Sequence, residues 1–181
     1  INLNHVLLEK VDAFEAAYEH DSGMKIMPSS LSIKEFRKSK PEKLKDFKRE
    51  FKKIADIILV DSAAGLGNEA MCAIDMADEL IIVTNPEMPA ITDALKTIKI
   101  IEQMKKKTSG VIVTRVKKND IEMQPETVRE MLEVPILGMV PEDIMVSKSL
   151  GMKDAVVHTH PKSNSARAYK EIAAKMLGVE Y

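Results

Sequence analysis

A carboxylate follows an apolar run at residue 61 of the chain. The stretch reads IILVDSAAGLG, so that four branched apolar residues at 57–60 precede Asp61, small residues, and the glycines Gly65 and Gly67. A buried strand has no use for a charge unless the strand ends there and the carboxylate faces a ligand. A carboxylate at such a place is suited to Mg²⁺, which keeps several waters, and the glycines allow the backbone to approach a phosphate. Asp61 could equally cap the helix that follows.

Short β-branched runs alternate along the chain with longer segments of helical periodicity, and these elements would position the carboxylate. We predict strands at 25–28, 56–61, 80–84, 110–116 and 135–140. Several of them are continuously apolar, which predicts an α/β fold: a three-layer, mostly parallel sheet with helices on both faces. In such sheets ligands sit outside the carboxyl ends of the strands, where Asp61, Thr84, Thr114 and Pro141 fall.

Three segments have the apolar spacing of amphipathic helices. One follows Pro41 and carries apolar residues three or four positions apart: Leu44, Phe47, Phe51 and Ile54. The others are predicted at 89–106 and at 163–177, the latter stopping at Gly178. The chain shows no internal repeat or low-complexity linker, so we expect residues 1–181 to form a single domain.

Composition excludes several classes of protein. With 181 residues, 45% of them hydrophobic and 30% charged, the chain has the makeup of one globular domain with a sizeable core. A formal charge of −1 argues against a general nucleic-acid binder. No apolar run approaches the roughly 20 residues that cross a bilayer, and no signal-peptide pattern begins the sequence, so we expect a cytoplasmic location without membrane contact. The single cysteine, Cys72, is interpreted as a small core residue.

Two further patterns could indicate binding, but each has a simpler interpretation. Residues 34–53 carry ten basic and four acidic side chains with interleaved phenylalanines. We interpret them as a solvated helix face over a buried stripe, because the phenylalanines have core spacing. His158 and His160 are two residues apart with no neighbouring carboxylate in the predicted loop, which is weak support for a metal site.

The order and spacing of four motifs resemble those of a known family. DSAAG at 61–65 resembles the D-x-x-A-G magnesium-and-switch motif of the MinD/ParA family of deviant P-loop ATPases. LIIVTNPE at 80–87 is similar to the family's following strand, and GVIVTRV at 110–116 resembles its base-binding strand. VPILGMVPED at 134–143 is similar to the last strand and its nucleotide-facing turn. The resemblance covers the chain from residue 24 onward and is closest to archaeal MinD-like proteins.

The resemblance implies a role for several residues in binding ATP or ADP with Mg²⁺. Asp61 would hold the metal through a water, and the backbone N–H of Gly65 would sense the γ-phosphate. Four residues at strand ends would flank adenine and ribose: Thr114, Arg115, Pro141 and Glu142. The family usually has asparagine where Thr114 stands. Asparagine donates and accepts at a base edge at once, whereas threonine offers one hydroxyl.

The function implied by the resemblance is an ATP-driven switch in spatial regulation, such as placement of the cell-division site. Nucleotide binding would favour a homodimer, hydrolysis would dissolve it, and a protein partner would be recruited in one state only. A P-loop NTPase needs G-x-x-x-x-G-K-S/T around the phosphates, and this sequence has no such stretch. We therefore expect a P-loop NTPase-like but N-terminally incomplete fold, with the family's loop upstream of Ile1, and no ATP hydrolysis by residues 1–181 alone.

Two alternatives remain open at this point. A nucleotide-free adaptor with the same fold would explain the missing P-loop and Thr114, but it gives no reason for Asp61 and Gly65. A receiver domain phosphorylated on Asp61 would use a parallel sheet as well. That fold requires an acidic pair after its first strand, where this sequence has Ser29-Ser30.

Overall fold

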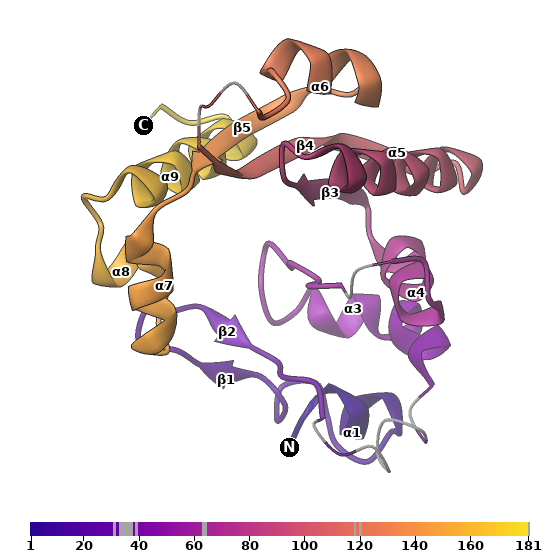
Figure 1. Cartoon of the computed structure of the whole chain (residues 1–181). Helices are drawn as coiled ribbons and strands as arrows, with labels where there is room; N and C mark the ends of the chain where they lie inside the picture. The colour runs from indigo at the N-terminus through magenta and orange to yellow at the C-terminus, as the bar shows by residue number, and fades with distance from the viewer. Residues whose placement is uncertain are drawn as a thin grey trace. The chain divides into compact units, whose positions relative to one another are not determined.

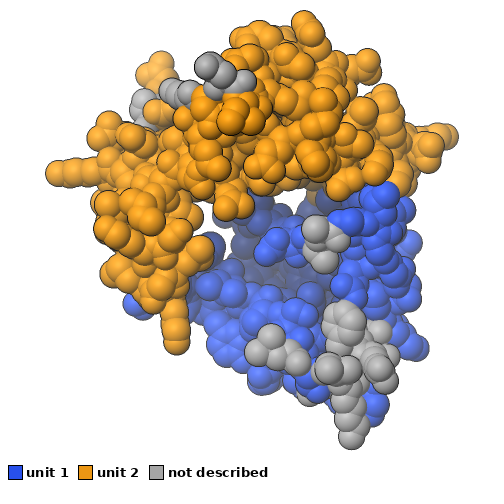
Figure 2. Space-filling model, in the orientation of Figure 1, with its two compact units in different colours: residues 1–77 blue, residues 78–181 orange. Residues whose placement is uncertain are grey.

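Figure 1 shows the computed structural model of the chain, which describes residues 1–30, 32, 38, 40–62, 65–117, 119 and 121–180. The chain divides into two compact units, residues 1–77 and 78–181, coloured separately in Figure 2. Each unit has buried apolar residues of its own. Among the described residues, no helix combines the length and the apolar character needed to cross a membrane.

The second unit is built on a parallel sheet of three strands in the order β3–β4–β5 (Figure 1). The strands are β3 (Glu79–Thr84), β4 (Lys107–Val116) and β5 (Ile136–Pro141). Val111 and Val113 of the central strand are fully buried, as expected of a continuously apolar strand in a parallel sheet. The three strands predicted in this half of the sequence are therefore confirmed, with small differences at their ends.

Helices flank this sheet. The connection from β3 to β4 contains α5, which contacts both strands, and the connection from β4 to β5 contains α6, which contacts α5. The last helix, α9, runs alongside β5 (Figure 1). The helices are α5 (Met88–Gln103), α6 (Pro125–Leu132), α7 (Ile144–Gly151), α8 (Val156–Thr159) and α9 (Asn164–Leu177).

The bounds of α9 follow from its two end residues. The Ser163 hydroxyl accepts a hydrogen bond from the Ala166 N–H at 3.2 Å, which satisfies one of the free donors of the first turn. Gly178 closes the helix with a φ of +67°, a conformation that glycine adopts without cost. The helix predicted at 163–177 is therefore confirmed.

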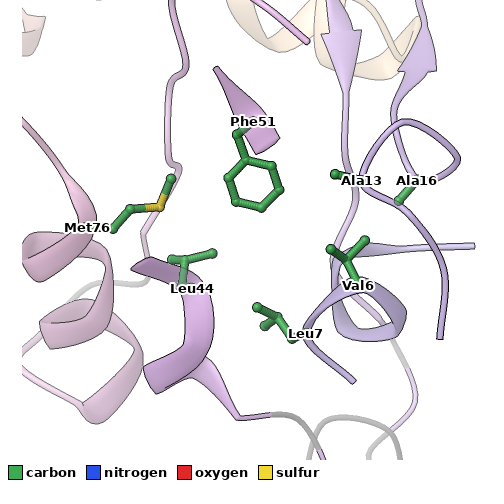
Figure 3. Packing of buried hydrophobic residues seen from close by; sticks show 7 residues of the cluster. All are labelled: Val6, Leu7, Ala13, Ala16, Leu44, Phe51 and Met76. Atoms are coloured by element: carbon green, nitrogen blue, oxygen red, sulfur yellow. The ribbon is translucent and has the colours of Figure 1, made fainter. Parts of the chain in front are cut away.

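The first unit has short elements around a small apolar core. They are α1 (Leu3–Leu7), β1 (Tyr18–Glu19), β2 (Lys25–Ile26), the 3₁₀ helix η1 (Pro41–Phe47), α3 (Lys48–Phe51) and α4 (Asn68–Met76). Figure 3 shows the seven buried side chains that gather in this core: Val6, Leu7, Ala13, Ala16, Leu44, Phe51 and Met76.

The stripe predicted after Pro41 packs against this core. Leu44 and Phe51 are buried, while Phe47 and Ile54 are partly buried against the same cluster. The interpretation of the basic segment as a solvated face over a buried stripe is thus confirmed for residues 40–53. Residues 34–37 and 39 of that pattern lie outside the described residues.

Two predicted strands are wrong as members of the parallel sheet. Residues 25–26 pair antiparallel with residues 18–19, and both strands are exposed. Residues 56–61 form no strand, and the run at 57–60 is exposed. A strand requires a neighbour that satisfies its backbone N–H and C=O groups, and none of the described strands pairs with residues 56–61.

Candidate functional site

The carboxyl end of β4 contains a bulge. Val113 pairs with Met139 and Val116 pairs with Pro141, so β4 carries one more residue than β5 over this interval. Arg115 lies in the bulge, is exposed, and has a φ of +59°. That left-handed conformation costs a residue with a Cβ about 1–2 kcal/mol. Bulges change the direction of side chains at sheet ends and are frequent beside functional sites, so this end of the sheet is a candidate ligand site.

An open depression of about 580 Å³ lies beside this bulge. It is lined by Val116, Lys117, Pro141, Glu142 and Asn164. The Lys117 Nζ lies 3.3 Å from the Glu142 Oε2, and the Glu142 N–H donates to the Val116 carbonyl at 3.0 Å. Apolar side chains together with one cation, one carboxylate and one amide are the lining expected for a ligand with an aromatic base and hydroxyl groups.

Thr114 ties the ends of β3 and β4 together. Its hydroxyl oxygen lies 3.2 Å from the Thr84 carbonyl oxygen and 3.0 Å from the Asn85 Oδ1. A hydroxyl has one proton, so these two acceptors share it. The structure therefore gives the Thr114 hydroxyl a role between neighbouring strands.

One carboxylate connects the turn after β5 to the start of α9. The Asp143 Oδ1 accepts from the Met145 N–H at 2.9 Å, which caps α7. The Asp143 Oδ2 accepts from the Ser165 N–H at 3.2 Å and from the Ser165 hydroxyl at 3.0 Å. The Met145 bond first, and then the Ser165 bonds, hold the pKa of Asp143 below its usual range, against the opposing effect of burial. The charged Asp143 carboxylate therefore links the start of α7 to the start of α9, and we call this link the Asp143 clasp.

Asp61 and Gly65 belong to the first unit. Asp61 is exposed, and Gly65 has a φ of +90°, which glycine adopts readily and other residues do not. Asp61 does not cap the helix that follows, because the N-cap residue of α4 is Gly67. The alternative of a capping aspartate is therefore wrong, and the carboxylate is accessible to a hydrated ion such as Mg²⁺, which requires only one or two protein ligands.

The structure brings together four of the six predicted site residues. Thr114 and Arg115 lie at the end of β4, and Pro141 and Glu142 lie at the end of the adjacent β5. Asp61 and Gly65 lie in the other unit. That all six face one ligand remains a prediction.

The sequence analysis missed two residues of the depression, Lys117 and Asn164. Lys117 directly follows the predicted strand 110–116, so the strand-end rule could have found it. Asn164 comes from the first turn of α9, and no local pattern links that position to the strand ends.

The two histidines of the sequence 158–160 have separate partners. The His158 Nδ1 lies 3.0 Å from the Asp154 Oδ1. The His160 Nδ1 lies 3.1 Å from the hydroxyl of Ser149, which is buried and donates to the Met145 carbonyl at 2.7 Å. These bonds order the segment around α7 and α8.

Comparisons with known proteins agree on one family. A sequence model of the family described as "ParA: NUBPL iron-transfer P-loop NTPase" matches residues 40–177. An uncharacterized ATP-binding protein of Methanocaldococcus jannaschii is 39% identical over 181 residues, which are 100% of this chain and 69% of that protein.

Solved structures agree with this match. The cell division ATPase MinD of Pyrococcus furiosus superposes with a TM-score of 0.93 at 27% identity, over 98% of this chain and 76% of that one. The septum site-determining protein MinD of Pyrococcus horikoshii, complexed with Mg-ADP, superposes with a TM-score of 0.91 at 28% identity, over 97% of this chain and 73% of that one. The fold is therefore that of MinD, with a parallel three-stranded sheet flanked by helices.

Proposed function

Because the chain belongs to the ParA family of P-loop NTPases, we propose that it forms the base-proximal and metal-proximal part of a MinD-like ATP-binding switch. The observation that carries this proposal is the depression at the ends of β4 and β5. Its apolar residues Val116 and Pro141 suit a purine ring, and the Glu142 carboxylate suits the ribose hydroxyls. Family membership also removes the alternative of a receiver domain phosphorylated on Asp61.

In this proposal the residues of the first unit act on the phosphates. Asp61 would hold Mg²⁺ through a water molecule, and the left-handed turn at Gly65 would present its backbone N–H to the γ-phosphate. Bound Mg²⁺ would neutralise developing charge on the phosphate oxygens during hydrolysis. A residue with a Cβ at position 65 would strain this turn, which is consistent with the glycine found there.

The switch itself is the finer part of the proposal. ATP would favour a homodimer that recruits a protein partner, and hydrolysis would release both. Two similar structures are those of a cell division ATPase MinD and of a septum site-determining protein MinD, which supports a role in positioning the division machinery. Radiolabelled phosphate release and light scattering with ATP or ADP test the cycle in the longest natural polypeptide that contains this sequence. A protein that neither hydrolyses ATP nor changes its mass with nucleotide would instead be the adaptor.

The metal role of Asp61 has a direct test in the longest natural polypeptide that contains this sequence. Isothermal titration with ATP should show binding that depends on Mg²⁺, and Asp61→Ala should weaken it about 10–100-fold, the range for residues that act on a metal from its outer shell. Asp56→Ala is the matched control, because Asp56 is an exposed carboxylate at the other end of the same apolar run. Equal affinities for the wild type and Asp61→Ala, both in Mg²⁺ and in EDTA, would refute the metal role.

A further inference from the structure

The Thr114 hydroxyl stands where the family resemblance suggested a base-reading residue, and it is already bonded between two strands. The Thr114 hydroxyl lies within hydrogen-bond distance of the Thr84 carbonyl and the Asn85 Oδ1, and it has one proton to give. A purine edge carries both donors and acceptors, so reading it requires a group that donates and accepts side by side. Another residue must supply that group if the site distinguishes one base from another.

Asn164 has the required chemistry and position. It is exposed, lines the depression together with Pro141 and Glu142, and carries an amide with two donors and one acceptor oxygen. It is the only amide side chain among the described residues that line this depression.

The Asp143 clasp holds Asn164 in place. Glu142 precedes Asp143 and Asn164 precedes Ser165, and the Asp143 carboxylate accepts two hydrogen bonds from Ser165 at 3.2 Å and 3.0 Å. The two residues that line the depression are therefore each adjacent to one partner of the clasp. Ser165 is fully buried, so the start of α9 is anchored and the amide is presented from a fixed backbone.

We infer that Asn164 reads the base edge of the bound nucleotide and sets a preference for adenine over guanine. An asparagine amide accepts from the adenine amino group and donates to the adjacent ring nitrogen at once, whereas guanine presents a different pattern of donors and acceptors. The inference rests on the proposed nucleotide function, and it makes Asn164 a specificity-determining residue and Asp143 a positioning residue.

The experiment measures the dissociation constants of Mg-ADP and Mg-GDP by calorimetry, using the longest natural polypeptide that contains this sequence. The ratio of interest is the dissociation constant of Mg-GDP divided by that of Mg-ADP. Asn164→Ala should reduce this ratio about 10-fold, because it removes the paired hydrogen bonds to adenine. Asn164→Asp should shift the ratio further toward GDP, because a carboxylate only accepts and guanine offers two neighbouring donors. Thermal unfolding of both variants establishes that they fold.

Arg167→Ala is the matched control, since Arg167 is an exposed residue of the same helix and does not line the depression. It should leave the ratio unchanged. An unchanged ratio in both Asn164 variants, a wild type without preference, or an equal loss in Arg167→Ala would overturn the inference while nucleotide binding stands. A wild type that binds neither nucleotide would overturn the proposed function and the inference together.

Discussion

Replacing Gly138 by alanine tests how closely α9 packs on β5. A Cβ at Gly138 would lie 2.3 Å from the Ile172 Cγ1 and 2.7 Å from its Cδ1, and Ile172 is only 5% exposed. Because Cγ1 is not the free end of the side chain, Ile172 must leave its rotamer or α9 must shift. Overpacking of this kind costs about 1–3 kcal/mol, and the lower entropy of an unfolded alanine returns about 0.5–1 kcal/mol. We expect Gly138→Ala to lower the free energy of unfolding by about 1–2 kcal/mol.

Urea unfolding followed by circular dichroism measures this loss, and hydrogen exchange of the β5 amides locates it in the second unit. The control is Gly151→Ala, since a Cβ there meets nothing within 4 Å and alanine favours the end of α7. Combining Gly138→Ala with Ile172→Ala removes the clash, so the glycine substitution should then cost little. If Gly138→Ala costs as much in the Ile172→Ala background as in the wild type, the packing argument fails.

Three other variants test the supports of the site. Ser163→Ala, which removes the acceptor for the Ala166 N–H, should cost about 1 kcal/mol in urea unfolding, whereas Ser163→Thr should cost much less. The Met145 N–H holds the pKa of Asp143 below its usual range, so this carboxylate contributes its full stabilisation above the pKa that it has in the unfolded chain. That stabilisation is lost as the pH falls through the lower pKa of the folded state. Asp143→Asn should flatten this part of the pH dependence, and equal slopes would contradict the assignment. Arg115→Gly relieves about 1–2 kcal/mol of strain and gives back about 0.5–1 kcal/mol because glycine has more freedom in the unfolded chain. It should therefore raise the free energy of unfolding by about 0.5–1 kcal/mol while weakening nucleotide binding, and a loss of stability would mean that the bulge holds no strain.

The sequence predicted the sheet of the second unit because its strands are long, continuously apolar and separated by helical segments. It failed at 56–61, where the same apolar pattern occurs but Ile57 and Leu59 are 61% and 79% exposed. Hydrophobicity marks residues that would gain from burial, but it does not reveal whether a pairing strand is available. The failure at 25–28 had a local signal, because Gly23 turns the chain with a φ of +81° and the His20 N–H donates to the Met24 carbonyl at 2.8 Å.

Predicting the site from the sequence succeeded where position along a strand was sufficient. Thr114 and Pro141 lie at strand ends in the sequence and at one edge of the sheet in the structure. Asn164 could not be found this way, because Asp143 brings it to the depression through contacts between residues far apart in the chain. The bulge at Arg115 had no sequence signal either, since no glycine marks it.

Arg115 differs in its surroundings from the other non-glycine residues with a positive φ. Four other non-glycine residues have a positive φ among those described, and each lies at or just after the end of a helix: Glu9, Lys105, Glu133 and Lys153. A left-handed residue there closes the helix, so local structure accounts for it. Arg115 lies inside β4, where the pairing of Val116 with Pro141 and the Glu142 N–H bond to Val116 hold the bulge on its far side. Strain that neighbouring bonds enforce, at a strand end beside the depression, is consistent with the nucleotide site proposed there.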